Sequence, residues 1–102
     1  MKYQLVLQWP ASSIDDYESM IELEKLLMEG LTPGSEIDGH DAGSGEINIF
    51  VRTNEPKRAF EEVKSILGRQ DLWSNIRVAY RELDATKYTI IWPKNLKDFR
   101  IT

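Results

Sequence analysis

The densest group of chemically reactive side chains lies in the stretch DGHDAGSGE, which runs from Asp38 to Glu46 and contains the only histidine of the chain. On an extended strand, Asp38 and His40 project to the same face, and Glu46 returns beside them if the glycines form a hairpin. One imidazole and two carboxylates on one face are typical ligands of a divalent metal ion. The stretch is therefore a candidate metal site, although the commoner interpretation of this composition is a polar turn held by local hydrogen bonds.

Acid–base chemistry is a second hypothesis for this stretch. A histidine side chain titrates near neutral pH, and Asp38 or Asp41 is placed to orient His40. Ser44 is the candidate nucleophile, but it lies in a Gly-Ser-Gly turn with no strand-to-helix elbow and no evident oxyanion donor. The pattern thus weighs against nucleophilic catalysis. It leaves, as one functional alternative, a small-ligand or divalent-metal-dependent enzyme centred on Asp38, His40, Asp41 and Glu46.

Three arginines on neighbouring predicted strands form another candidate group, Arg52, Arg77 and Arg81. If they converge, their guanidinium groups can hold a carboxylate or a phosphate by paired hydrogen bonds. The interpretation that we favour is a set of solvated cross-strand ion pairs with acidic residues such as Asp38 and Glu46. The candidate ligand-binding residues are therefore Asp38, His40, Asp41, Glu46, Arg52 and Arg81.

Alternation of apolar and polar residues predicts the strands that must position these side chains. In the first strand, Tyr3, Leu5 and Leu7 share one face. The five predicted strands cover residues 2–9, 36–41, 46–53, 75–83 and 87–92. Glycines between the second and third strands favour a β-hairpin, and a short polar turn after the fourth favours another.

Apolar residues at three- and four-residue spacing predict two helices between these strands. Ser12 and Ser13 are candidate caps of the first helix, and Asp15 and Asp16 place negative charge in its first turn, where it complements the helix dipole. We expect this helix to end at Gly30 or within the next few residues. Its glutamates are interpreted as a solvated acidic side, made of Glu18, Glu22, Glu24 and Glu29.

The second helix is expected to follow a cap at Thr53 or Asn54. Pro56 suits its first turn, because no intrahelical N–H is needed there. Gly68 is its predicted stop. The tail from Pro93 onward is mixed in character, and we expect its apolar residues, Leu96, Phe99 and Ile101, to pack back on the domain.

The resulting order is β-α-β-β-α-β with one additional C-terminal strand, which predicts a single α+β domain over residues 1–102 with the ferredoxin-like split βαβ sandwich arrangement. Both helices are expected on one face of an antiparallel sheet, with the apolar alternates beneath them. The polar alternates then form an open face that carries the candidate site. This assignment requires His40 to contact water rather than lie beneath a helix.

Bulk composition limits the classes of function. A length of 102 residues fits one domain, and the absence of cysteine excludes disulfides, thiolate zinc sites and cysteine nucleophiles. The net charge of −4 and the lack of a stacking platform in the first strand disfavour nucleic-acid binding. No stretch approaches the roughly 18 apolar residues of a membrane span, and the N-terminus lacks a secretory-signal pattern. We therefore expect a cytoplasmic protein without a membrane or nucleic-acid partner.

Several sequence blocks also carry a family resemblance. The blocks QWPAS, DGHDAGSGEINIF and VAYRE, with the final Trp-Pro and Asp-Phe-Arg, resemble a family of small uncharacterised bacterial proteins. The resemblance spans nearly the whole chain. It implies a bacterial, cytosolic, ferredoxin-like domain and transfers no catalytic residue.

The leading functional hypothesis is a non-enzymatic binding module. A sheet covered on one side leaves one open face and two edges, and either can meet a protein partner or a second copy of the chain in a homodimer. Trp9, Trp73 and Trp92 are interpreted as core or rim packing residues. No cofactor is expected.

Overall fold

The computed structural model describes residues 1–14, 17–43, 45–68 and 71–101. The strands are β1 (Tyr3–Pro10), β2 (Ser35–Gly43), β3 (Glu46–Thr53), β4 (Arg77–Glu82) and β5 (Thr89–Trp92). The helices are α1 (Tyr17–Gly30) and α2 (Pro56–Leu67), with short 3-10 helices at Ala11–Ser13 and Asp71–Asn75. The five strands lie within about two residues of the predicted ranges, and the two 3-10 helices were not predicted.

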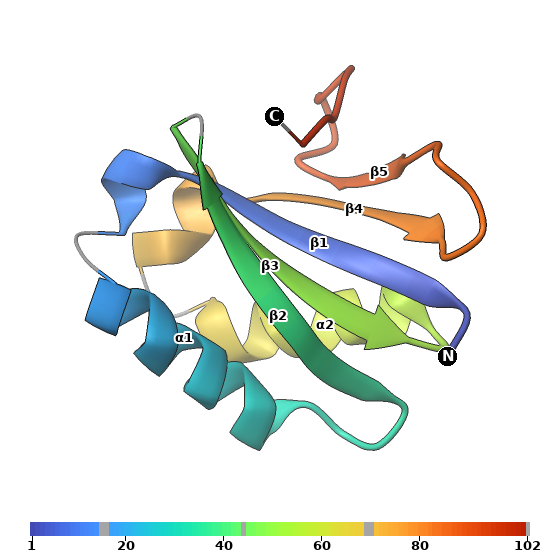
Figure 1. Cartoon of the computed structure of the whole chain (residues 1–102), viewed down its shortest axis with the longest axis horizontal. Helices are drawn as coiled ribbons and strands as arrows, with labels where there is room; N and C mark the ends of the chain where they lie inside the picture. Colours follow the sequence, from blue (N-terminus) through green and yellow to red (C-terminus); the bar gives the residue numbers. More distant parts are fainter. Residues whose placement is uncertain (15–16, 44, 69–70, 102) are drawn as a thin grey trace.

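The strands form one antiparallel sheet in the order β2-β3-β1-β4-β5 (Figure 1). β1 therefore lies between β3 and β4, as the split βαβ arrangement requires, and β5 extends the sheet as the hairpin partner of β4. The α+β fold predicted from the sequence is confirmed. The sheet has two outer strands, β2 at one edge and β5 at the other.

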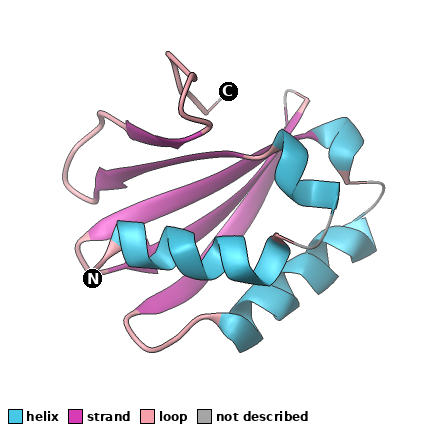
Figure 2. Cartoon of the chain, turned by 180° about the vertical axis from the view of Figure 1, so that it is seen from behind, coloured by secondary structure: helices cyan, strands magenta, loops and turns pink. Residues whose placement is uncertain are grey.

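Both helices cover the same face of the sheet, which Figure 2 shows from the helix side. The alternation in β1 accounts for this packing, since Leu5, Leu7 and Trp9 are fully buried on the helix side. From the helices, Leu27 and Val63 reach the same core. Burial of such side chains is the main stabilising contribution to a domain of this size.

The first helix begins later than its predicted caps, Ser12 and Ser13, indicate. Ser12 and Ser13 lie in the 3-10 helix at Ala11–Ser13, and α1 begins at Tyr17. Asp15 and Asp16 lie outside the described residues. α1 ends at Gly30, as predicted.

The second helix has Pro56 at its first position and ends at Leu67, just before Gly68, as predicted. Its predicted caps behave differently from a standard N-cap. The Thr53 hydroxyl accepts a hydrogen bond from the backbone N–H of Glu55 at 3.0 Å. This bond holds the turn that leads into the helix, while the cap position itself is Glu55.

The face expected to be open is covered over part of its area. Val6 and Ala79, which point away from the helices, are fully buried, and Phe99 from the C-terminal segment packs on them. Leu96 and Ile101 join this second apolar cluster, so the expected return of the tail is confirmed. The expectation of a wholly open polar face was wrong, because its central positions are apolar and gain stability when the tail removes them from water.

The same segment also covers two polar residues. Gln8 and Asn48 are each only 1% exposed. The Gln8 amide donates one hydrogen bond to the Asn48 side-chain oxygen and another to the backbone carbonyl of Arg100, each at 3.0 Å. These bonds compensate for part of the lost hydration and connect the C-terminal segment to the centre of the sheet, while the Gln8 side-chain oxygen is buried without a hydrogen-bond partner among the described residues.

Candidate functional site

An irregularity in β2 decides where the side chains of the DGHD stretch point. Ile37 pairs with Val51, but the next pair along β3 is Phe50 with Gly39, so Asp38 is an extra residue in its strand. Gly39 has a φ of 124°, which L side chains rarely adopt. A bulge of this kind shifts the alternation by one residue. Asp38 and His40 therefore point to opposite faces, and the prediction that they share a face was wrong.

His40 lies on the helix side of the sheet, against α1. It pairs with Ile49, a core residue of β3, and its Nδ1 atom is 2.5 Å from the Oε1 atom of Glu24. The side chains of His40 and Glu24 are 27% and 11% exposed. His40 is thus placed beneath a helix, which removes the condition on which an open-face site depended.

The assignment of Glu24 to the solvated acidic side of α1 was also wrong. It lies one residue after the buried Leu23, and its contact with His40 ties α1 to β2. A partly buried carboxylate needs such a hydrogen-bonding partner to offset its desolvation. The pair is therefore a packing contact between two elements.

The three candidate arginines form separate contacts. The Nε atom of Arg52 lies 3.0 Å from the Asp38 carboxylate, and Arg77 lies 3.9 Å from Glu46. Arg52 and Asp38 join the neighbouring strands β3 and β2, whereas Arg77 on β4 and Glu46 on β3 have β1 between them. Both are ion pairs between strands, as in the interpretation that we favoured. Solvated pairs of this kind contribute little to stability, about 1 kcal/mol at most.

The contacts of Arg81 hold local structure rather than a ligand site. Its Nε donates to the side-chain oxygen of Gln4 at 3.1 Å. One terminal nitrogen donates to three backbone carbonyls, those of Glu82, Leu83 and Ala85, at 2.9 to 3.2 Å. These bonds hold the turn that follows β4 and use most of the guanidinium donors.

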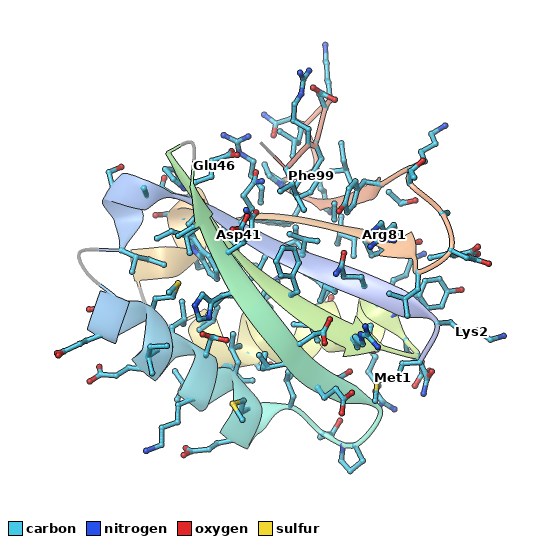
Figure 3. The ribbon with its side chains drawn as sticks, in the orientation of Figure 1. Met1, Lys2, Asp41, Glu46, Arg81 and Phe99 are labelled. Atoms are coloured by element: carbon cyan, nitrogen blue, oxygen red, sulfur yellow. The ribbon has the colours of Figure 1, made fainter. Side chains whose placement is uncertain are left out.

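Asp41 and Glu46 lie near the tip of the β2–β3 hairpin, whereas Arg81 lies at the other end of the sheet (Figure 3). Ser44, the candidate nucleophile, is outside the described residues. Within the described ranges, no three histidine, cysteine or acidic residues come together in an arrangement that holds a metal ion. The six candidate ligand-binding residues are therefore distributed over both faces and both ends of the sheet.

A groove that the sequence reasoning missed lies between α2 and the edge strand β5. Its volume is about 880 Å³, against about 340 Å³ for the hollow beside the β2–β3 hairpin. All four residues of β5 line it, together with one side of α2. From α2 and the segment after β5 come Lys57, Phe60, Glu61, Lys64, Lys94 and Asn95.

The groove has an aromatic floor. The ring centroids of Phe60 and Trp92 are 6.2 Å apart, and Trp73 lies 5.7 Å from Trp92. Nζ of Lys64 lies 5.5 Å from the centroid of the Trp92 ring, within the range of a cation–π contact. Trp73 and Trp92 pack against the core, as interpreted from the sequence, but both stay partly accessible.

The rim of the groove is basic, with three lysines and one glutamate. A pattern in the sequence of the second helix indicates this basic rim. Lys57, Phe60, Glu61 and Lys64 have the spacing i, i+3, i+4, i+7, which places them on one side of a helix. The second helix was predicted from its apolar residues, and the lysines on either side of Phe60 were not considered as part of a site.

Charge is divided unevenly along the chain. Residues 1–55 contain three basic and eleven acidic residues, a net −8, and residues 56–102 contain ten basic and six acidic residues, a net +4. The first part supplies α1 and the edge strand β2, and the second supplies α2 and the edge strand β5. The two edges of the sheet therefore belong to regions of opposite charge.

Comparisons with protein-family models, with curated proteins and with solved structures gave no match for this chain. The family resemblance of the sequence blocks therefore stays a prediction. Among the described residues, none of the helices has the length and apolar character needed to cross a membrane.

Proposed function

We propose that this chain is a non-enzymatic interaction module that binds an extended acidic peptide in the groove between α2 and β5. The observation that carries the proposal is that the groove follows every residue of an edge strand and is flanked by a helix. This is the arrangement in which a peptide adds to a sheet as a further strand, with its side chains directed toward the helix and the sheet.

Main-chain pairing accounts for affinity in this mode of binding. As the outermost strand, β5 presents one row of backbone N–H and C=O groups away from β4. An extended peptide satisfies that row irrespective of its sequence. Selectivity must then come from the side chains that line the groove.

Those side chains favour carboxylates alternating with apolar groups. Lys57, Lys64 and Lys94 outnumber Glu61 at the rim, so a peptide with acidic residues is attracted and a basic one is repelled. The rings of Phe60 and Trp92 offer an apolar surface for the intervening residues. An acidic and apolar alternation therefore fits both features.

Two earlier alternatives are less well supported by this geometry. The sheet face opposite the helices is partly covered by the C-terminal segment, which leaves the edges as the better candidates. The enzyme centred on Asp38, His40, Asp41 and Glu46 required these side chains to converge. The bulge in β2 and the contact between His40 and Glu24 are inconsistent with that convergence.

The test is a titration of the labelled protein with a blocked peptide of alternating Glu and Val, followed by NMR. Shift changes are expected in residues 57–64 and 89–95, and a Lys and Val peptide of equal length should bind at least about tenfold more weakly. Equal binding of both peptides, or shifts confined to the β2–β3 hairpin, would refute the proposal.

A pair of charge variants separates the groove from general charge effects. Lys64→Glu reverses a charge in the groove, whereas Lys25→Glu makes the same change on an exposed position of α1. We expect Lys64→Glu to weaken binding of the acidic peptide by about tenfold and Lys25→Glu to change it by less than about twofold at physiological salt. Equal effects of both variants would assign the binding to net charge.

A further inference from the structure

We infer that the groove between α2 and β5 selects a peptide in which two acidic residues flank a central basic residue, and that Glu61 sets this preference. The inference rests on the proposed function of the groove and deepens it by naming the order of charges in the peptide. It is carried by the order of charged side chains along α2 and by the direction in which α2 passes β5.

The helix α2 and the strand β5 run in the same direction. At the start of α2, Lys57 lines a hollow with Tyr80 of β4, and Tyr80 pairs with Thr89, the first residue of β5. In the last turn of α2, Nζ of Lys64 lies 5.5 Å from the ring centroid of Trp92, the last residue of β5. Seven residues of helix advance about 10.5 Å, and three residues of strand advance about 10 Å. The two lysines therefore lie near opposite ends of β5.

Glu61 lies between these two lysines on the same side of α2. The order of charges beside β5 is positive at Lys57, negative at Glu61 and positive at Lys64, and all three residues are exposed and line the groove. Lys94 follows Trp92 by two residues and adds a second positive charge at that end. The rim as a whole is basic, as the proposed function requires, but its centre along α2 is acidic.

The carboxylate of Glu61 is available to a bound peptide. The next carboxylate of α2, that of Glu62, accepts hydrogen bonds from the backbone N–H and the hydroxyl of Thr32, so it is directed toward the segment that follows α1. Within the described part of the chain, Glu61 forms no ion pair with either lysine. Pairs at these helical spacings are weak in any case, so a peptide side chain can compete with them.

The spacing of side chains along an added strand fits this order of charges. Alternate side chains of the strand point toward α2, and three such positions span about 13 Å. Lysine side chains are long and flexible, so Lys57 and Lys64 reach the two outer positions. The middle position then faces Glu61. A lysine at that position gains a partner of opposite charge, whereas a glutamate there is repelled.

Three blocked peptides that differ at one position test the inference. They contain Glu-Val-Lys-Val-Glu, Glu-Val-Gln-Val-Glu or Glu-Val-Glu-Val-Glu between identical neutral flanks, and fluorescence anisotropy gives each dissociation constant at one salt concentration. We expect the wild-type protein to bind the peptide with central Lys about threefold more tightly than the peptide with central Glu, with central Gln between them. Glu61→Lys should reverse this order, and Glu61→Gln should remove the preference for central Lys.

Circular dichroism first establishes that the Glu61 variants fold. Glu22→Lys makes the same change of charge at an exposed position of α1 and should leave the order of the peptides unchanged. Equal binding of the central Lys and central Glu peptides, an order that Glu61→Lys leaves unchanged, or an order that Glu22→Lys also reverses would overturn the inference. The proposed function would still stand if these peptides bind more tightly than Lys-Val-Lys-Val-Lys. Equal binding of Lys-Val-Lys-Val-Lys, or no binding of any peptide, would overturn both.

Discussion

Replacement of Gly39 by alanine tests the bulge that separates Asp38 from His40. Gly39 has a φ of 124°, and an added β-carbon there would meet nothing within 4 Å. The penalty is therefore one of backbone conformation alone, about 1–3 kcal/mol. Alanine also restricts the unfolded chain, which offsets about 0.4–1 kcal/mol of it. We expect Gly39→Ala to lower the free energy of unfolding by about 1–2 kcal/mol.

Gly43 is a matched control on the same strand. A β-carbon there also meets nothing within 4 Å, but its φ lies outside the positive range. Gly43→Ala should therefore leave stability unchanged or raise it by up to about 1 kcal/mol. Urea unfolding followed by tryptophan fluorescence compares the two variants, and Gly39→Ala should shift the midpoint down by about 1 M.

Two results would refute this reasoning. One is an equal effect of both alanine variants, which would mean that the backbone at Gly39 is unstrained for an L residue. The other is a wild-type NMR spectrum in which His40 shows no contact with α1. If removal of the bulge instead shifts the register of β2, His40 should leave Glu24 and move to the opposite face.

Three further predictions concern stability. Phe99→Ala should lower the free energy of unfolding by about 3 kcal/mol in urea, because Phe99 is 8% exposed and closes the second cluster. The Thr32 hydroxyl lowers the pKa of Glu62 from its usual 4.5, so this bond stabilises the fold above pH 4.5 and is lost as pH falls through the lowered value. Thr32→Val should therefore destabilise at pH 7 and have a smaller effect in strong acid, as measured by urea unfolding. Arg81→Lys should cost about 1 kcal/mol in the same assay, because an ammonium group cannot reach all the acceptors held by the guanidinium.

The fold was predictable because each element carries its own periodicity. Leu5, Leu7 and Trp9 alternate along β1 over a register without bulges, so their common face follows from the sequence alone. In α2, the spacing of Phe60 and Val63 and the positions of Pro56 and Gly68 fix both the face and the ends. Local patterns suffice where no residue interrupts them.

The candidate site was not predictable because one residue interrupts its pattern. Glycine between Asp38 and His40 is compatible with regular pairing and with a bulge, and the two choices place His40 on opposite faces. The bulge is favoured by a tertiary contact, because it allows His40 to reach Glu24 on α1. An alternation rule contains no information about that contact.

The covering of the sheet face opposite the helices could not be predicted from the alternation of residues in the strands alone. The apolar tail residues were visible in the sequence, but their landing place depends on Val6 and Ala79, which lie far from them along the chain. Gln8 and Asn48 belong to the polar alternates expected in solvent, and they are buried because the Gln8 amide nitrogen donates to Asn48 and to the Arg100 carbonyl. Burial of polar residues depends on partners, and partners are set by the fold.

The covering of both faces has a consequence for function. With helices on one side and the C-terminal segment over part of the other, the outer strands β2 and β5 each have one side along which no further strand pairs within the described part of the chain. Proteins usually protect such edges with charges and bulges, and β2 has both. β5 also has a register shift in its pairing with β4, but it has in addition a groove beside it, lined by Phe60 and Trp92. The basic groove, rather than the absence of a bulge, is therefore the feature that favours the β5 edge for an acidic peptide.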